Sequence, residues 1–335
     1  MKVYELQNSF GIDSLRLTER PQPQPGEAQV LVKLRTWSLN YRDLLVVKGI
    51  YHPKLPLPFT PLSDGVGQVV AVGAGVTRVQ PGERVAGLFM QKWINGAVTE
   101  AKAKTALGAA IPGVAAEYVV FDAEGVVPVP AHLTDEEAAA LPCAALTAWH
   151  ALITVGQLQA KETVLIQGTG GVSLFALQFA RHVGARVIVT SSHDDKLARA
   201  LKLGATDGIN YRTTPAWSKR VRELTEAGAD HIVEVGGAGT LPESLRAVRM
   251  GGRISLIGVL SGAGQVDPLP ILMRNICVQG IYVGSRVMFE AMNATITQHQ
   301  LRPVLDKVFP FADLPAALRH MENGAHFGKI VLRHS

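Results

Sequence analysis

A strand, a glycine-rich turn and a helical pattern over residues 163–183 constrain the fold more than any other feature of this sequence. The apolar run VLIQ leads into GTGG, and an amphipathic stretch follows over 171–183. The same alternation recurs at RVIVT before 195–203, at GIN before 215–225, and at HIVEV before LPESLRAVRM. Repeated units of this kind predict an α/β fold with a doubly wound parallel sheet.

The first part of the chain has a different pattern. Val-rich stretches such as AQVLVKLRTWSL and GVGQVVAVGAGV predict β-strands, and the helix expected there follows Asn40. The stretch 300–335 returns to this style, with a helix over 312–322 before KIVLRH. Since 335 residues are many for one core, we expect a β-rich domain over 1–125, completed by 300–335, and a nucleotide-binding domain over 126–299.

Composition indicates a globular protein rather than a membrane or nucleic-acid-binding protein. The net charge is +5, but no basic run is interleaved with aromatic residues, so we expect no nucleic-acid partner. The most apolar window, 138–155, contains Pro142 and His150 and lacks basic flanks, which predicts a buried helix.

Cysteine usage and the first residues indicate the compartment. Cys143 and Cys277 are too few for a disulfide framework. MKVYELQNSF has no apolar core typical of a signal peptide. We therefore expect a cytoplasmic protein.

The turn GTGGVS is typical of a dinucleotide-binding site. Gly168 allows a tight turn, Gly170 lets the backbone approach a pyrophosphate, and the helix beginning at Gly171 and Val172 offers free N–H groups. Ser173 replaces the third glycine of the usual fingerprint, where a small residue is sufficient for helix–strand packing. A purely structural turn remains the alternative.

The end of the next strand indicates which dinucleotide is bound. Ser191 and Ser192 stand where an acidic residue would bind the ribose of NAD, and Lys196, Tyr211 and Arg212 follow nearby. Hydroxyls and cations at this point favour the 2′-phosphate of NADP(H).

Three alternatives to a phosphate site remain. Ser192 and Asp195 are also a possible helix-capping pair. Lys196 and Arg212 are also consistent with solvated charges, and Asp194 is near enough in sequence to bind a ribose.

The whole chain resembles the medium-chain dehydrogenase/reductase superfamily. The resemblance rests on a GroES-like first part, LPCAALTAWHAL, GTGGVS and the closing HFGKIVL. The branch that it resembles most is that of the zinc-independent quinone oxidoreductases, which are related to zeta-crystallin and to enoyl reductases.

The positions that hold zinc in the zinc-dependent members of this family have changed here. Ser38 replaces the first cysteine, Leu62-Ser63-Asp64 replaces Gly-His-Glu, and Cys143 alone matches a ligand. The segment 89–113, in the place of the structural zinc lobe, has no cysteine. A catalytic zinc needs about three protein ligands, so we expect no metal, although Asp64 and His52 are possible helpers of Cys143.

The resemblance also implies catalytic residues. Asn40 matches a residue near the nicotinamide ribose, and Tyr51 matches the tyrosine that enoyl reductases use as an acid or oxyanion donor. Tyr41 is a second candidate donor. A surface or wall position is the alternative for both tyrosines, and an ion pair is the alternative for Arg42 with Asp43.

Further cofactor contacts are implied less directly, with a turn or packing role as the alternative in each case. They are Thr147, Gly236, Gly258, Val283, Gly284, Ser285, Phe327, Gly328 and Lys329. Trp93 is expected either to line the substrate opening or to pack in its lobe.

These features lead to one main function and two alternatives. We expect an NADPH-dependent, zinc-free reductase of a small electrophile, either a quinone or an α,β-unsaturated carbonyl, because hydride addition to a conjugated system spreads charge without a metal. The alternatives are an alcohol dehydrogenase or carbonyl reductase, with a metal at Cys143, and a non-enzymatic NADPH-binding regulator.

The resemblance also implies an oligomeric state. In the family, strands like GRISLIGVLSG and CVQGIYVGS pair across a two-fold axis, so we expect a homodimer.

Overall fold

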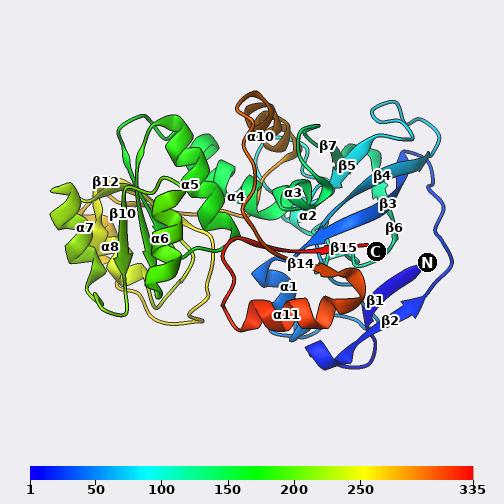
Figure 1. Cartoon of the computed structure of the whole chain (residues 1–335), viewed down its shortest axis with the longest axis horizontal. Coiled ribbons are helices and arrows are strands. Elements are labelled where there is room, and N and C mark those ends of the chain that lie inside the picture. Colours follow the sequence, from blue (N-terminus) through cyan, green and yellow to red (C-terminus); the bar gives the residue numbers. More distant parts are fainter. Residues whose placement is uncertain (335) are drawn as a thin grey trace. The chain divides into compact units, whose positions relative to one another are not determined.

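The computed structural model describes residues 1–334, which form two compact units. Unit 1 comprises residues 1–146 and 284–335, and unit 2 comprises residues 147–283. Figure 1 shows the elements of both units along the chain. The α/β fold class predicted from the sequence, with a GroES-like part and a parallel Rossmann sheet, is confirmed.

Unit 1 is built around a mostly antiparallel sheet with the order β14-β15-β3-β4-β5-β7, in which β6 also pairs with β3. Its strands are β3 (Gln29–Ser38), β4 (Asp64–Val72), β5 (Arg84–Gly87), β6 (Tyr118–Asp122), β7 (Val126–Pro128), β14 (Leu305–Pro310) and β15 (Lys329–Arg333), with a separate hairpin of β1 (Lys2–Leu6) and β2 (Leu15–Glu19). Its helices are α1 (Tyr41–Val47), α2 (Glu100–Ala103), α3 (Asp135–Ala139), α10 (Arg286–Gln298) and α11 (Leu314–Glu322).

The two ends of the chain meet in the core of unit 1. Trp37 of β3 is fully buried and stacks on Phe311 with ring centroids 4.0 Å apart. Its indole N–H donates to the carbonyl of Val114 at 2.5 Å. The stacking of Trp37 on Phe311 holds the C-terminal part of the chain against β3.

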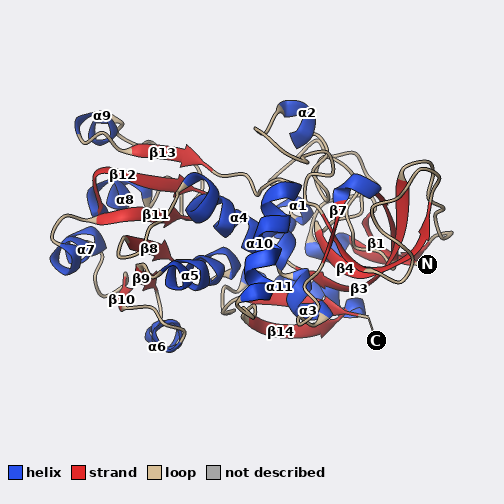
Figure 2. Ribbon diagram, turned by 90° about the horizontal axis from the view of Figure 1, so that it is seen from above, coloured by secondary structure: helices blue, strands red, loops and turns tan. Residues whose placement is uncertain are grey.

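Unit 2 is a six-stranded parallel sheet with the order β10-β9-β8-β11-β12-β13. Its strands are β8 (Thr163–Gln167), β9 (Arg186–Ser191), β10 (Asp207–Asn210), β11 (Ala229–Glu234), β12 (Val248–Leu256) and β13 (Cys277–Gly280). Its helices are α5 (Gly171–Val183), α6 (Asp194–Lys202), α7 (Trp217–Thr225), α8 (Leu241–Ala247) and α9 (Leu269–Met273), and Figure 2 shows helices on both faces of the sheet. The core takes one large aliphatic residue from each of five adjacent strands, namely Leu165, Ile188, Ile209, Ile232 and Ile254.

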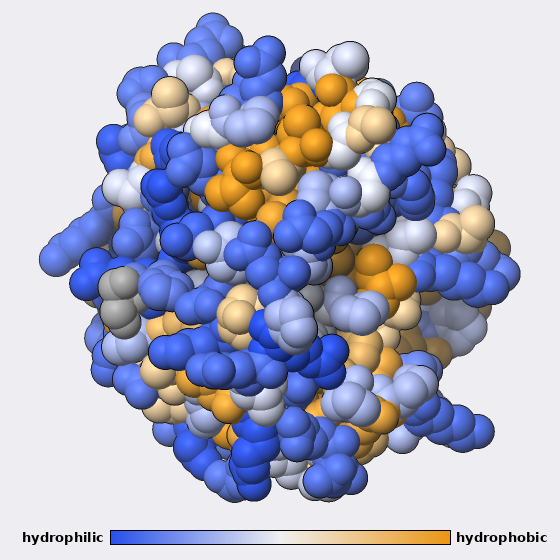
Figure 3. All heavy atoms as spheres, turned by 90° about the vertical axis from the view of Figure 1, so that its right-hand side faces the viewer, coloured by the Kyte–Doolittle hydropathy of each residue, from blue (hydrophilic) through white to orange (hydrophobic). Residues whose placement is uncertain are grey.

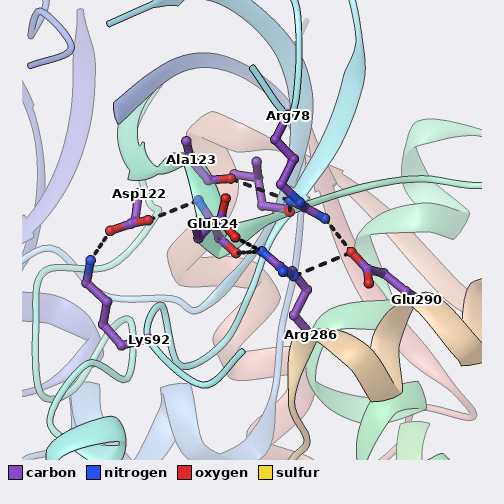
Figure 4. A network of polar contacts seen from close by, with 8 residues as sticks. Arg78, Lys92, Asp122, Ala123, Glu124, Arg286 and Glu290 are labelled. Atoms are coloured by element: carbon purple, nitrogen blue, oxygen red, sulfur yellow. Dashed lines mark hydrogen bonds and ion pairs between the residues drawn. The ribbon is translucent and has the colours of Figure 1, made fainter. Parts of the chain in front are cut away.

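The units differ from the expected domain ranges, because residues 126–146 and 284–299 pack with unit 1. Figure 4 shows one reason, a polar network that ties α10 to the region of β7. Arg286 of α10 pairs with Glu124, Glu290 of α10 pairs with Arg78, and Arg78 also donates to the carbonyl of Val126 at 2.5 Å. These contacts fix α10 to the β-rich unit, which the helical pattern of its sequence does not reveal.

The apolar window 138–155 is not one regular helix. It forms the end of α3, π-helical turns at Leu141–Ala145 and His150–Val155, and α4 (Leu146–Trp149) between them. Such π-helical turns are frequent at functional sites.

Within residues 1–334, no helix has the length and apolar character needed to cross a membrane. The face shown in Figure 3 is mostly hydrophilic, with smaller hydrophobic areas between.

Candidate functional site in two parts: a dinucleotide-binding edge and a buried polar chain

The glycine turn after β8 has the geometry of a phosphate-binding loop. Gly168 has φ +71°, a left-handed conformation that favours glycine, and its N–H donates to the carbonyl of Thr190 at 2.8 Å. Gly170 is extended (φ −79°, ψ −174°) just before α5, and a Cβ built there would meet no atom within 4 Å. The turn therefore leaves open space in front of a helix N-terminus, which fits the phosphates of a dinucleotide.

The serine in the third glycine position has a packing role. Ser173 is buried, and its hydroxyl donates to the carbonyl of Gln167 at 2.7 Å. This hydrogen bond ties the first turn of α5 to the end of β8, so a small polar residue serves where glycine is usual.

The residues expected at the 2′-phosphate lie around the ends of two paired strands. Ser191 ends β9 and is the register partner of Asn210, which ends β10. The N–H of Tyr211 donates to the carbonyl of Ser191 at 3.1 Å, and Lys196 lies in the first turn of α6. Lys196 is only 9% exposed, so it is not a solvated surface charge.

The structure also bears on the alternatives at this edge. The N-cap of α6 is His193, with no side-chain capping bond, so the capping pair of Ser192 with Asp195 is wrong. The hydroxyl of Ser192 contacts Nδ1 of His193 at 2.7 Å. Asp194 accepts a hydrogen bond from the side-chain amide of Asn210 at 2.7 Å, and Arg212 is exposed.

Two glycines expected to touch the cofactor are also required by local packing. A Cβ on Gly236 would lie 2.2 Å from Oγ1 of Thr240, and a Cβ on Gly258 would lie 2.5 Å from the carbonyl oxygen of Val235. A tight turn is therefore sufficient to explain both glycines.

A buried carboxylate that the sequence analysis did not single out stands at the end of β11. Glu234 is fully buried and accepts hydrogen bonds from Gln167 and from the backbone N–H groups of Gly236 and Gly237. The available signal was the acid two residues before the first glycine in VEVGG, together with a glutamine directly before GTGG.

In unit 1, a chain of hydrogen bonds connects several of the expected residues. The Lys329 ammonium donates to Oδ1 of Asn40 at 2.6 Å, and the Asn40 amide donates to the Ser63 hydroxyl at 3.3 Å. Ser63 donates to Oδ1 of Asp64 at 2.7 Å, and Oδ2 of Asp64 accepts the backbone N–H of Cys143 at 3.1 Å. Four of these five residues are buried, and Cys143 is partly so.

A second buried carboxylate lies next to this chain. Asp43 is fully buried and accepts the N–H of Asn40 at 2.8 Å. It lies 3.6 Å from a guanidinium nitrogen of Arg42, so the ion pair given as the alternative for these two residues is present. Burial raises the pKa of Asp43 to about 6, although Arg42 acts in the opposite direction. Arg42 also stands over the ring of Tyr51, 5.8 Å from its centroid.

The donor set at the positions of the family's zinc ligands does not fit a metal. Ser38 and Asp64 are register partners on β3 and β4, so these positions do come together. However, both oxygens of the Asp64 carboxylate already accept hydrogen bonds. Burial, and then the Asp64 carboxylate, raise the pKa of the Cys143 thiol to about 12. His52 is exposed, and residues 1–334 contain no group of three or more His, Cys, Asp or Glu side chains suited to a metal.

The remaining candidate residues differ in how far they are exposed to solvent. Tyr41 and Tyr51 are each 42% exposed, so neither side chain is part of the buried core. Thr147, Val283, Phe327 and Trp93 are buried. The Trp93 indole donates to the carbonyl of Gly96 at 2.8 Å, which supports the packing interpretation.

Two backbone positions from the same set have special local roles. Val283 has φ +55°, which is unusual for a β-branched residue, and its carbonyl contacts Nδ1 of His150 at 2.6 Å. The hydroxyl of Ser285 caps α10 by accepting the N–H of Met288.

The dinucleotide edge of unit 2 and the polar chain of unit 1 define a nicotinamide-dependent oxidoreductase. Residues 26–131 match the family described as alcohol dehydrogenase GroES-like domain, and residues 171–298 match the family described as zinc-binding dehydrogenase. The chain belongs to the medium-chain dehydrogenase/reductase superfamily and is an NAD(P)H-dependent oxidoreductase.

Similar proteins carry several activities in their names. A zinc-type alcohol dehydrogenase-like protein of Schizosaccharomyces pombe is 44% identical over 334 residues, which is 96% of each chain. A structure described as an NAD-dependent alcohol dehydrogenase is 34% identical, covers 100% of both chains and has a TM-score of 0.91.

Two mycobacterial structures are also similar to this chain, and each match covers 99% of both chains. One, 29% identical with a TM-score of 0.84, is a complex with NADPH. The other, 28% identical with a TM-score of 0.82, is described as a quinone oxidoreductase.

The open space at Gly170 leads to a first prediction. Gly170→Val should raise the dissociation constant for the dinucleotide at least tenfold, because the side chain enters the space that phosphates need, while the melting temperature stays within a few degrees. Gly280→Ala is the matched control, since a Cβ there also meets no atom within 4 Å. Unchanged cofactor affinity in Gly170→Val would contradict the phosphate site.

The raised pKa of Asp43 leads to a second prediction. The folded protein holds this proton more tightly than the unfolded chain, whose carboxyl has a pKa near 3.8. The buried group therefore lowers the free energy of unfolding progressively as pH rises from about 4 to 6. Relative to Asp43→Asn, the wild type should lose about 1–3 kcal/mol between pH 4 and pH 7. Urea unfolding of both proteins at the two pH values measures this difference, and parallel pH profiles would refute it.

Proposed function

We propose that this enzyme is an NADPH-dependent, metal-independent reductase of quinones or α,β-unsaturated carbonyls. The observation that carries the proposal is the chemistry of the family's zinc positions. A serine, a carboxylate with both oxygens hydrogen-bonded and a buried neutral thiol occupy them. Unit 2 binds the dinucleotide, and unit 1 supplies the residues that act on the substrate.

The substrate class follows from how negative charge is stabilised. The nicotinamide supplies a hydride when bound. On a simple ketone the hydride produces a localised alkoxide, which zinc stabilises in related alcohol dehydrogenases. On a conjugated acceptor the charge spreads over an enolate or a quinol oxygen, where one hydrogen-bond donor and one proton are sufficient.

The residues of unit 1 have separate roles in this proposal. Tyr51, which is exposed and has Arg42 over its ring, donates the proton to the substrate oxygen. Asn40 is held between Lys329 and Ser63, so its side chain is fixed in one orientation. That fixed amide positions ligand groups beside it without a rotamer cost.

Preference for NADPH over NADH is supported by the strand ends of β9 and β10. Ser191 stands where a carboxylate would repel a 2′-phosphate, and the buried Lys196 brings a positive charge to the same edge. The NADPH complex of a mycobacterial relative agrees with this preference. Because another relative is described as NAD-dependent, the affinities of this enzyme for NADPH and NADH are compared directly below.

A substrate panel tests the function. The purified enzyme should reduce benzoquinones and enones with NADPH, oxidise simple alcohols poorly, and retain its activity after dialysis against a chelator. Tyr51→Phe should lower kcat by about a hundredfold, as expected for loss of a proton donor, with little change in cofactor affinity. Alcohol oxidation that disappears with the chelator, together with stoichiometric bound zinc, would show the metal-dependent alternative instead.

Cofactor preference has its own test. Charge-assisted hydrogen bonds contribute about 1.5–3 kcal/mol each, so Lys196→Ala should weaken NADPH binding about ten- to a hundredfold and NADH binding little. Ser191→Asp should shift the preference toward NADH by repelling the phosphate. Lys202→Ala, at the exposed far end of α6, is the control. Equal losses for both cofactors in Lys196→Ala would refute the phosphate contact.

We also propose a homodimer formed through the open edge of unit 2. Strand β13 ends the sheet, and the segment between β12 and β13 carries exposed apolar residues, namely Val259, Leu260, Leu269, Leu272 and Met273. Sedimentation should give twice the 35.8 kDa of one chain, and Leu272→Glu with Met273→Glu should give monomers. Leu201→Glu on α6 is the control. A monomeric wild type at micromolar concentration would contradict the dimer.

A further inference from the structure

The two central strands of unit 2 end in a pair of polar side chains. In the order β10-β9-β8-β11-β12-β13, the chain continues from β8 toward β9 and from β11 toward β12. The carboxyl ends of β8 and β11 therefore flank the point where the strand order reverses, which is where doubly wound sheets bind ligands. Gln167 ends β8, and Glu234 ends β11.

The Glu234 carboxylate has a complete set of partners. Oε1 accepts the N–H groups of Gly236 at 2.8 Å and Gly237 at 3.0 Å, and the Thr240 hydroxyl at 2.5 Å. Oε2 accepts the Gln167 amide at 2.6 Å and the Ser244 hydroxyl at 2.5 Å. A fully buried carboxylate is costly without such donors, and here five of them offset the cost.

Gln167 completes the connection to the glycine turn. Its Oε1 accepts the backbone N–H groups of Val235 at 3.2 Å and Gly236 at 3.3 Å, while its Nε2 donates to Glu234 and to Ser244. Gln167 directly precedes Gly168, and its own carbonyl is held by Ser173. The two side chains thus bind the turn after β8 to the turn after β11.

We infer that Glu234 and Gln167 are positioning residues for the dinucleotide. They set the distance and the orientation between the phosphate turn and the Val235–Gly237 turn, so that both backbones meet the ligand without rearrangement on binding. The inference rests on the dinucleotide site of the proposed function and is independent of the substrate. It predicts that disturbing this pair lowers cofactor affinity even when the protein stays folded.

A charge swap tests this inference. Gln167→Glu places two carboxylates 2.6 Å apart, and Glu234→Gln places two amide N–H groups in the same position. The double variant carries one acceptor and one donor there again, with the roles exchanged. Each single variant should raise the dissociation constants for NADPH and NADH about tenfold or more, and the double variant should return to within about threefold of the wild type.

Milder variants keep the test decisive if a single swap does not fold. Thr240→Ala removes one hydroxyl that donates to Glu234 and should weaken cofactor binding about threefold or more. Thr163→Ala, at the amino end of β8, is the matched control and should leave affinity unchanged. Calorimetric titration measures binding well below the melting temperature of each variant, so lost stability is separated from lost affinity.

The outcomes separate this inference from the proposed function. Variants that melt earlier but bind both cofactors as the wild type does would show a merely structural role and overturn the inference. A double variant with no recovery would overturn it as well. A wild type that binds neither cofactor would instead refute the dinucleotide site itself.

Discussion

Parallel pairing between β8 and β11 is the constraint on which the ligand-binding edge of unit 2 depends. Their register places His231, Ile232 and Val233 opposite the residues of β8, so both strands end at the same edge. Since the chain leaves them toward opposite sides, no crossing connection covers that edge. The glycine turn, the serine end of β9 and the Glu234 carboxylate all take their positions from this pairing.

In unit 1, strand register likewise brings charged side chains together in one buried region. Strand β3 is flanked by β4 and β15, and Ser38 at its end is the partner of both Asp64 and Val331. This brings Lys329 and Asp64 into one buried region with Arg42 and Asp43, so two basic and two acidic side chains offset one another. Burial of any one of them alone would be costly.

Elements set by local pattern were predictable from the sequence, and elements set by distant contacts were not. The predicted helix 171–183 is α5, because its apolar period and its flanking glycines are local signals. The helical stretch predicted over 215–225 begins instead at Trp217, because the Thr214 N–H closes a turn onto the carbonyl of Asn210. Glu234 was missed because its partner Gln167 is 67 residues away, a separation that no sequence motif encodes.

The arrangement also explains how one family supports different reactions. In the proposed function, the backbone turns, Ser191 and Lys196 of unit 2 hold the dinucleotide, and these groups serve any nicotinamide chemistry equally well. In the proposed function, the response to developing negative charge depends on unit 1, where Ser63, Asp64 and Cys143 form a hydrogen-bonded chain at the zinc positions. Because Asp64 and Cys143 contact one another through a backbone N–H, a metal would have to displace a satisfied hydrogen bond and a thiol proton together. In the proposed function, the substitutions in unit 1 therefore change the reaction without requiring any change in how unit 2 holds its cofactor.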